Sequence, residues 1–416
     1  MQPTVSLENY PVFSHTAPPS SLARQIPPRL RRMLSLDDFE IAARKHLPGP
    51  IFAYVSGGCE TDRSLRANRA AFEGYEWVNR VLVDTSRRSL ATSLFGHRYA
   101  APFGIAPMGI SALSAYRGDL IQAQAAAALN VPMIMSGSSL IRMEDVARAN
   151  PAAWFQAYVP GEPERILALL DRVEAAGFGT LVVTVDVPVS GNRENNIRAG
   201  FSTPLRPGPR LAWDGITHPR WLIGTALRTL VRHGMPHFEN SHATRGAPIL
   251  ASNVMRDFGA RDHLSWEHFA LIRRRWKGRL VVKGILDVGD AQQARDQGAD
   301  GIVLSNHGGR QLDGVVSPMR VLPAARQALG PDYPLMIDSG FRRGNDVLIA
   351  LALGASFVFV GRPFNYAGAI GGQPGVQHAI GVLASEVARN MAMIGILSPS
   401  DASPANLMPR QDVPAL

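Results

Sequence analysis

The chain has 416 residues, of which 46% are hydrophobic and 19% are charged, so it can bury a large core and is neither a disordered nor a fibrous protein. Lys and Arg outnumber Asp and Glu by 43 to 34, and only three of these cations are lysines, Lys45, Lys277 and Lys283. The arginine excess has two explanations, a coding bias or an anionic partner such as a phosphate or a membrane surface. Nucleic acid is not an expected partner, because runs of five or more like charges are absent and aromatic residues do not interleave with the basic ones.

Cys59 is the single cysteine, so an intrachain disulfide and a cysteine-rich metal site are both excluded, and a reducing compartment is expected. The longest uncharged stretches, 99–116 and 363–385, are interrupted by Pro and Gly, and neither predicts a helix of about 20 apolar residues that crosses a bilayer. Residues 1–33 contain six prolines and lack the apolar segment of a signal peptide, which predicts a flexible arm.

From about residue 101 onward, short β-branched or apolar runs alternate with longer segments of helical spacing, a pattern typical of βα units on a parallel sheet. The eight runs are 102–108, 132–136, 153–159, 180–187, 279–285, 301–306, 334–339 and 357–361. Eight such units favour a closed TIM (β/α)8 barrel of the α/β class over an open doubly wound sheet. Consistently, no Gly-x-Gly-x-x-Gly sequence follows the first run, as a dinucleotide-binding fold would require.

The spacing of the runs also predicts the domain organisation. The interval 188–278 is too long for one helix and its loops, so we expect an insertion after the fourth strand, at about 198–260, before a helix near 266–276. The remaining expected helices between runs include 115–130, 163–176, 287–297 and 343–353. The chain is therefore expected to consist of an N-terminal arm at 1–33, one barrel domain at 34–395 and a C-terminal tail at 396–416.

An N-terminal helical segment is expected to precede the barrel. Residues 35–44 and 58–71 have the composition of short helices, and Ser35 with Asp37 or Asp38 is a suitable N-terminal cap for the first. We expect both helices to cover the bottom or the side of the barrel.

The expected C-terminal ends of the strands, where TIM barrels carry their functional residues, are unusually polar. A single polar residue there is usually a cap or turn former, but here seven of the eight ends carry polar side chains. In chain order they carry Pro107-Met108-Gly109, Ser136, Gln156 with Tyr158, Thr184 with Asp186, Lys283, Ser305-Asn306-His307, Asp338-Ser339-Gly340 and Gly361-Arg362.

The last two units predict a phosphate site. Asp338-Ser339-Gly340-Phe341-Arg342 opens a helix and Gly361-Arg362 follows the eighth run, so glycine amides, a helix N-terminus and guanidinium groups converge after strands 7 and 8. The alternative is a pair of ordinary turns with solvated arginines.

Lys283 ends an apolar run inside the expected mouth of the barrel. A buried lysine requires an anionic or electron-rich partner, because an unpaired buried cation is costly. Two roles are open on this basis: a Schiff base with a carbonyl substrate, or stabilisation of a reduced, anionic cofactor ring.

The segment 304–314, LSNHGGRQLDG, is the most specific in the chain. It places His307 at a strand end beside two glycines, with Arg310 three residues further on. A histidine can accept a proton near neutral pH, and an arginine can bind a carboxylate through two parallel hydrogen bonds. Together they predict a catalytic base and an anchor for an acidic substrate.

With these residues the chain resembles the FMN-dependent 2-hydroxy-acid oxidases and dehydrogenases, a family that includes glycolate oxidase, flavin-type lactate dehydrogenases, flavocytochrome b2 and mandelate dehydrogenase. The resemblance extends from about Leu34 to Ile394 and rests mainly on Ser305–Asp313. Its further motifs are Tyr54–Gly58, Asn68–Phe72, Gln156–Tyr158, Thr184–Asp186, Arg193-Glu194, Val282–Gly284 and Asp338–Gly340.

The resemblance implies FMN as the cofactor and a role for each matching residue. His307 would be the base and Asp186 would support its imidazolium form. Arg310 and Tyr54 would bind the substrate carboxylate with Arg193 nearby, and Tyr158 would hydrogen-bond the substrate. The residues implied around FMN are Pro107, Met108, Gly109, Ser136, Gln156, Thr184, Lys283, Ser305, Asp338, Ser339, Gly340, Phe341, Arg342, Gly361 and Arg362. Lys283 would lie near N1 and C2=O of the flavin, which disfavours the Schiff-base role.

Two features indicate which members of the family the chain resembles. Gly109 occupies a position where the oxidases typically carry Ala and the mandelate and membrane lactate dehydrogenases carry Gly. The segment 198–240 resembles the membrane-attaching insertion of mandelate dehydrogenase, and it contains six Arg against Asp214 and Glu239, with Trp and Leu interspersed. It therefore predicts a basic amphipathic segment at a membrane surface, the alternative being a loop over the active site or in an oligomer contact.

The expected activity is oxidation of an L-2-hydroxy acid, lactate-like or mandelate-like, to the 2-oxo acid, with electrons passed to a quinone or another acceptor. The alternatives are an oxidase that forms H2O2, a Schiff-base lyase and a non-catalytic flavin-binding module. The α-hydrogen can leave as a proton or as a hydride, and the residues favour neither route. The resemblance further implies a homotetramer at the inner face of the cell membrane, and no metal site is expected.

Overall fold

The computed structural model describes residues 26–202, 206, 208–251 and 261–410. Its centre is an eight-stranded parallel sheet in the order β4-β11-β10-β9-β8-β7-β6-β5. The strands are β4 (Phe103–Ile105), β5 (Ile134–Ser136), β6 (Trp154–Ala157), β7 (Thr180–Thr184), β8 (Arg279–Ile285), β9 (Gly301–Leu304), β10 (Leu335–Ile337) and β11 (Phe357–Val360). A parallel bridge between Ile105 and Met133 joins the first and last strands and closes the barrel, as predicted.

Apart from the exposed Arg279 and the half-buried Gly284 of β8, the strand residues are buried on both faces, as expected for a parallel barrel enclosed by helices. In β7, Val182 belongs to the cluster inside the barrel, whereas Leu181 and Val183 belong to the layer between barrel and helices. The interior cluster consists of Leu94, Tyr99, Ala106, Ile134, Trp154, Val182, Val281, Val303, Met336, Phe357 and Phe359. The interior is therefore a packed core, and the site can open only at one end.

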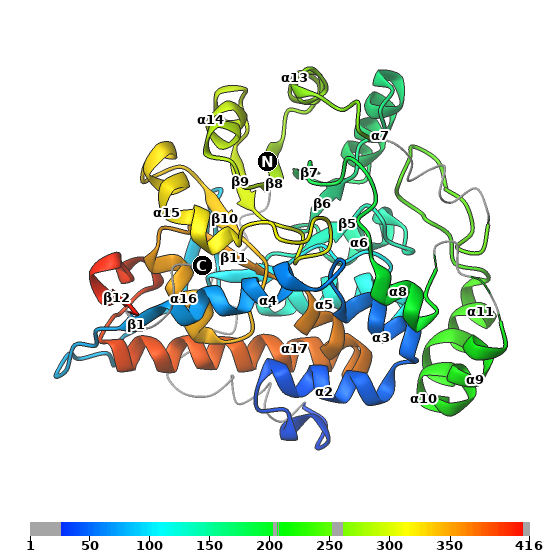
Figure 1. Ribbon diagram of the computed structural model, residues 1–416, viewed down its shortest axis with the longest axis horizontal. Coiled ribbons are helices and arrows are strands. Elements are labelled where there is room, and N and C mark those ends of the chain that lie inside the picture. The colour runs from blue at the N-terminus through cyan, green and yellow to red at the C-terminus, as the bar shows by residue number, and fades with distance from the viewer. Residues whose placement is uncertain (1–25, 203–205, 207, 252–260, 411–416) are drawn as a thin grey trace.

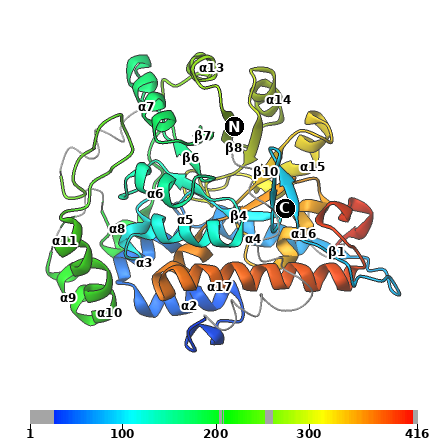
Figure 2. The same cartoon turned by 180° about the vertical axis from the view of Figure 1, so that it is seen from behind.

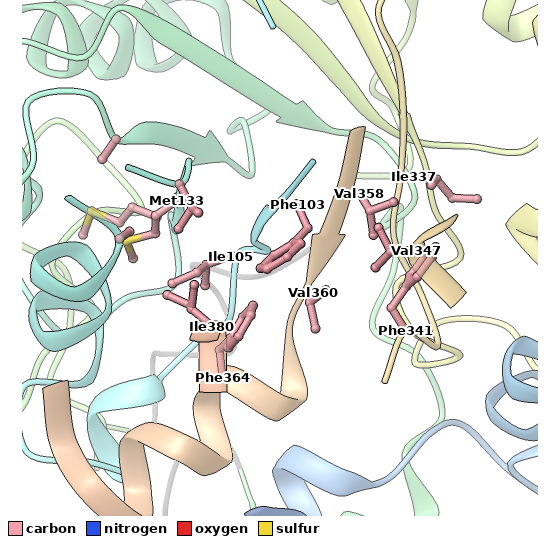
Figure 3. Packing of buried hydrophobic residues seen from close by; sticks show 14 of the residues in the cluster. Phe103, Ile105, Met133, Ile337, Phe341, Val347, Val358, Val360, Phe364 and Ile380 are labelled. Atoms are coloured by element: carbon pink, nitrogen blue, oxygen red, sulfur yellow. The ribbon is translucent and has the colours of Figure 1, made fainter. Parts of the chain in front are cut away.

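The outer layer packs the strands against surrounding helices. Figure 3 shows part of this layer, in which Phe103 and Ile105 of β4 lie next to Phe364 and Ile380 of α17. The helices that follow the eight strands are α5 (Gly118–Leu129), α6 (Met143–Ala149), α7 (Pro163–Ala175), α13 (Trp266–Arg275), α14 (Val288–Asp296), α15 (Pro318–Leu329), α16 (Gly344–Ala352) and α17 (Arg362–Ile394). Within α17, Gly372 has a φ of 60° and breaks the helical path.

Among the described residues, three α-helices precede the barrel strands. Ser35 and Asp38 form a capping box that starts α2 (Leu36–His46), as the sequence predicts, and α2 runs along α17 at the side of the barrel (Figures 1 and 2). It is followed by α3 (Gly49–Ser56) and α4 (Arg63–Ala70).

The expected position of the 58–71 helix is wrong. The amide of Ser64 donates to Asp313 Oδ1, and Asn68 exchanges hydrogen bonds with Asn306, so α4 lies over the C-terminal end of β9 and not at the bottom or side. The bottom is instead covered by the hairpin β2 (Thr92–Leu94) and β3 (His97–Tyr99), because Leu94 and Tyr99 extend the interior cluster.

The predicted insertion after the fourth barrel strand is present. Its helical elements are α8 (Glu194–Ala199), α9 (Pro209–Thr217), α10 (Pro219–Trp221), the π-helical turn η5 (Leu222–Leu227) and α11 (Arg228–His233). Helices α9–α11 form a group beside α3 and α8, away from the barrel (Figure 1). Within the described residues, no helix combines the length and apolar character needed to cross a bilayer.

Folded structure continues beyond both predicted limits of the barrel domain, before residue 34 and after residue 395. In the expected N-terminal arm, residues 1–25 lie outside the described residues, but Leu30, in the 3-10 helix η2 (Leu30–Arg32), is fully buried. In the expected C-terminal tail, η6 (Pro399–Asp401) and η7 (Pro404–Asn406) lead to β12 (Leu407–Pro409), which pairs antiparallel with β1 (Tyr75–Trp77) after η3 (Ala71–Gly74). Residues 26–33 and 396–410 are therefore parts of the folded body, because their apolar residues are needed to cover it.

Candidate active site

A cavity opens at the C-terminal ends of the barrel strands, where function was expected. It is lined by most of the predicted site residues, namely Tyr54, Pro107, Met108, Gly109, Tyr158, Thr184, Arg193, Lys283, His307, Arg310, Asp338, Ser339, Gly340, Phe341, Arg342, Gly361 and Arg362. The other four do not line the cavity: Asp186 and Ser305 contact the lining residues His307 and Lys283, Ser136 accepts a hydrogen bond from the amide of the lining residue Ser138, and Gln156 lies next to Ser136.

A chain of three side chains runs through the base of the cavity. His307 Nδ1 lies 3.0 Å from Asp186 Oδ1, and His307 Nε2 lies 3.3 Å from the Tyr158 hydroxyl. An ionised Asp186 can only accept, so the Nδ1 atom carries the imidazole proton and Nε2 keeps its lone pair toward the cavity. His307 is thus oriented as a proton acceptor.

The electrostatic surroundings maintain this arrangement. Burial lowers the pKa of His307, and nearby Lys283 and Arg193 lower it further, which together outweigh the opposing effect of Asp186. Burial raises the pKa of Asp186, but its interaction with His307, which includes the hydrogen bond from the imidazole, and the charge of Lys283 outweigh this, so its pKa lies below the usual value. The resting pair is therefore neutral histidine beside carboxylate, ready to accept one proton.

The backbone after β9 explains the glycines of the 304–314 segment. His307, Gly308 and Gly309 have consecutive φ values of 58°, 66° and 73°. A Cβ at Gly309 would lie 2.6 Å from the backbone nitrogen of Leu65, and one at Gly308 would lie 2.6 Å from Arg362 Nη1. Only glycine fits these two positions, and His307 itself is held in a left-handed conformation that is unusual for a side-chain-bearing residue.

Three arginines give one side of the cavity a positive charge. Arg310 Nη1 donates to Gly57 O at 2.7 Å, and its Cζ lies 5.0 Å from the Tyr54 ring centroid. Arg193 donates to Arg310 O and Gln311 Oε1. Among the described residues, no carboxylate forms an ion pair with Arg310, Arg193 or Arg362. Because burial also lowers the pKa of Arg310, this group would be stabilised by a bound anion.

Lys283 has a partner that sequence reasoning missed. Its Nζ lies 3.0 Å from Asp338 Oδ2 and donates to Ser305 Oγ at 2.8 Å, and the Lys283 side chain is 4% exposed. Lys283 lies in β8, and Ser305 and Asp338 directly follow the neighbouring strands β9 and β10. Strand order therefore brings together residues that are 55 positions apart, which no spacing in the sequence reveals.

The residues present fit an FMN group. Gln156 Nε2 and Thr184 Oγ1 are buried without a hydrogen-bond partner in the described part of the chain. Leaving such groups unpaired costs about 1–3 kcal/mol each, so they mark a place for a polar ligand. Ser136 supports Gln156, because its hydroxyl donates to Gln156 Oε1 at 3.3 Å.

The region after β10 and β11 fits a phosphate. The amides of Gly340 and Phe341 have no acceptor within the described residues, and a Cβ at Gly340, whose φ is 93°, would collide with Asn68 O at 2.6 Å. Arg362 uses Nε and Nη2 to bind the carbonyls of Val55, Gly57 and Gly308, which leaves the two N–H groups of Nη1 for an anion. Arg342 was also expected at the phosphate, and its Nη2 lies 3.4 Å from Glu40 Oε2 of α2.

The insertion contributes three cavity residues that the sequence did not single out, Phe238, Ile249 and Arg261. Arg261 is 9% exposed, and its Cζ lies 5.3 Å from the Tyr158 ring centroid. The apolar character of Phe238 and Ile249 within a polar insertion is a weak signal of burial, and Arg261 had none, because arginines are frequent throughout the chain.

Comparisons with known proteins agree with this geometry. A family model described as FMN-dependent dehydrogenase matches residues 43–409. The L-lactate dehydrogenase of Ectopseudomonas mendocina (strain ymp) is 40% identical over 365 residues, which are 87% of this chain and 95% of the relative. The (S)-mandelate dehydrogenase of Pseudomonas putida is 36% identical over 377 residues, covering 90% and 93% of the two chains.

A solved structure extends the agreement to the fold. The crystal structure of the monotopic membrane protein (S)-mandelate dehydrogenase superposes with a TM-score of 0.83 at 35% identity, covering 91% of this chain and 99% of the other. Its similarity spans the barrel and the cavity together. The chain belongs to the family of FMN-dependent dehydrogenases and is an oxidoreductase.

Proposed function

We propose that the protein oxidises an L-2-hydroxy acid, lactate-like or mandelate-like, to the 2-oxo acid. The observation that carries this proposal is the His307–Asp186 pair, joined to Tyr158 and placed in one cavity with Arg310 and Arg193. The activities for which the relatives are named, L-lactate and (S)-mandelate dehydrogenase, support the same substrate class.

The residues have complementary tasks in this reaction. Conversion of the C2 hydroxyl to a carbonyl removes two electrons and two protons from the substrate. Arg310, with Arg193 and Tyr54 beside it, binds the substrate carboxylate, and Tyr158 hydrogen-bonds the substrate next to the base. His307 accepts one proton at Nε2, and Asp186 stabilises the resulting imidazolium.

When bound, FMN would accept the two electrons and the second proton. Pro107, Met108, Gly109, Gln156, Thr184 and Lys283 would hold its ring, Ser305 and Asp338 would position Lys283, and Ser339–Arg342 with Gly361 and Arg362 would hold the ribityl chain and phosphate. This assignment is supported by the Gln156 and Thr184 side chains and the Gly340 and Phe341 amides, which lack a hydrogen-bond partner within the described part of the chain. Lys283 would place its positive charge beside the flavin ring, where it would stabilise the negative charge of the reduced form.

The proposed electron acceptor is a quinone or another carrier, and not O2. Gly109 supports a dehydrogenase, because the related oxidases typically carry Ala there. A Cβ at this position would lie 3.3 Å from both the Tyr54 hydroxyl and Ser138 Cβ, so the residue controls space beside the substrate site.

We also propose that the insertion binds the inner face of the cell membrane. Helices α9–α11 bury Trp221, whose Nε1 donates to Leu113 O, and expose Trp213, Ile216, Ile223, Leu227, Leu230 and Val231. Exposed Arg220, Arg228 and Arg232 lie on the same segment, and such basic, apolar surfaces bind anionic lipid. The monotopic character stated for the similar mandelate dehydrogenase supports this proposal.

A homotetramer is proposed from the family resemblance, and light scattering of the purified protein tests it.

Anaerobic bleaching of the flavin by a substrate panel tests the proposed function. Purified, FMN-reconstituted protein is mixed with lactate, mandelate, glycolate and long-chain 2-hydroxy acids, and the loss of flavin absorbance is recorded. At least one L-2-hydroxy acid is expected to bleach the flavin and yield its 2-oxo acid. Protein that binds no flavin, or flavin that no member reduces, would contradict the proposal. Stoichiometric H2O2 in air would identify an oxidase instead.

A further inference from the structure

Among the described residues, the wall of the cavity contributed by the insertion contains a charged residue, Arg261, that the reaction described above does not use. The backbone around Arg261 is held in place, since its amide donates to Pro188 O at 3.0 Å and its carbonyl accepts from the Leu264 amide at 3.1 Å. The residue is 9% exposed and lines the same cavity as His307 and Arg310. A fixed, buried cation is therefore part of the wall that a bound substrate meets.

The position of Arg261 relative to the base follows from Tyr158. The Tyr158 hydroxyl lies 3.3 Å from His307 Nε2, and the Arg261 guanidinium lies over the Tyr158 ring, with Cζ 5.3 Å from its centroid. A substrate with its C2 atom at His307 and its first carboxylate at Arg310 therefore has a second guanidinium within reach of a short side chain that extends past Tyr158.

The apolar lining around Arg261 makes its guanidinium selective for a charged substrate group over an apolar one. Phe238, Ile249 and Val187 line the cavity with Arg261, so water is partly replaced by apolar groups there. An ionic hydrogen bond is stronger in such a setting than in water, and an apolar substrate group placed against the guanidinium would block its solvation. Arg261 also lines a neighbouring cavity between the ends of β7 and β8 and helix α13, so it belongs to the wall between the two.

We infer that Arg261 determines the substrate class, and that the enzyme prefers an L-2-hydroxy acid whose short side chain ends in a second carboxylate. Arg310 and Arg193 bind the carboxylate next to the reacting carbon, and Arg261 binds the distal one. This inference rests on the proposed function and deepens it, because it concerns the side chain and leaves the roles at C2 unchanged.

The test compares matched acids in the FMN-loaded enzyme. The rate of anaerobic flavin reduction is measured for L-malate against L-2-hydroxybutanoate, and for L-2-hydroxyglutarate against L-2-hydroxypentanoate. The wild-type protein is expected to favour the dicarboxylate of at least one pair by about 10- to 100-fold in kcat/KM, the range expected for an ionic hydrogen bond. Arg261→Gln should lower this ratio by about the same factor, mainly through KM, and Arg261→Lys should restore part of it.

Two controls separate the outcomes. Arg274→Gln, an exposed change on α13, should leave the ratio unchanged. Binding of 2-oxoglutarate and 2-oxopentanoate, followed by the flavin difference spectrum, should show the same preference without turnover. A wild-type preference for the monocarboxylates, or an equal loss on both acids in Arg261→Gln, would overturn the inference while leaving the proposed function intact. Flavin that no 2-hydroxy acid reduces would overturn both.

Discussion

Lys283 Nζ and Asp338 Oδ2 lie 3.0 Å apart at the ends of β8 and β10, and both side chains are at least nine-tenths buried. Ser305 on the intervening strand β9 accepts a hydrogen bond from the same lysine. A buried cation and a buried anion thus stabilise each other at the mouth of the barrel, directly beside the proposed flavin site.

This pair makes single substitutions costly. Lys283→Met or Asp338→Asn leaves an uncompensated buried charge and should lower the free energy of unfolding by about 3–5 kcal/mol, whereas the double variant should recover most of this loss. Urea unfolding of the FMN-free proteins measures these values. Arg279→Gln, which removes a half-exposed ion pair with Asp300, is the control and should cost about 1 kcal/mol or less. Additive losses in the double variant would show that the two residues are not coupled.

Replacement of the base should separate cofactor binding from chemistry. His307→Gln is expected to bind FMN with nearly unchanged affinity, because the proposed flavin contacts are made by other residues, while flavin reduction slows by about 100- to 10,000-fold. Stopped-flow absorbance measures the reduction and fluorescence titration measures the affinity. Reduction at the wild-type rate would remove His307 from its role.

The pH dependence of flavin reduction should reflect the lowered pKa of His307. The neutral imidazole is the active form, so the rate is expected to be flat above about pH 6.5 and to fall only at lower pH. Asp186 raises the pKa of His307, so Asp186→Asn should shift this acidic limb to still lower pH while slowing the reaction overall. A limb that moves to higher pH in this variant would contradict the assigned electrostatics.

An added methyl group at position 109 should disturb the substrate site. The new Cβ would lie 3.3 Å from the Tyr54 hydroxyl, so Tyr54 or the substrate must move by a few tenths of an ångström. Gly109→Ala is expected to slow flavin reduction by about tenfold, since catalysis depends steeply on the position of the substrate. Gly74→Ala, with nothing within 4 Å of the added Cβ, is the matched control. Equal rates in both variants would contradict the placement of Tyr54.

Membrane binding should depend on the exposed apolar residues of the insertion. The triple variant Ile223→Ser, Leu227→Ser and Leu230→Ser should lose binding to anionic vesicles in a sedimentation assay, with flavin reduction retained. Substitutions are preferable to deletion of 198–240, because Phe238 lines the cavity and Asn240 accepts from the Met143 amide.

The control variant alters apolar residues elsewhere that are at least as exposed as Ile223, Leu227 and Leu230. Val81, Leu82 and Met393 are 75%, 102% and 70% exposed and lie outside the insertion. Their replacement by Ser should leave vesicle binding unchanged. If both triple variants bind as tightly as the wild type, the insertion is not the membrane contact.

The sequence alone was sufficient to predict the barrel and most of the cavity. Each of the eight strands lies within its predicted apolar run, because parallel barrel strands are buried on both faces and their apolar character is continuous. The His307–Arg310 segment could be recognised for a related reason. Its glycines are required by a left-handed backbone, and such local requirements are visible in a linear chain.

Only the tertiary structure decided which distant residues meet. The pairing of Lys283 with Asp338 depends on the order of strands around the barrel, and the position of α4 over β9 depends on hydrogen bonds from Ser64 and Asn68 to residues more than 230 positions away. Arg261 enters the cavity because its backbone is bound to Pro188. Such contacts are set by packing in three dimensions, so a residue common throughout the sequence acquired a specific place only in the folded protein.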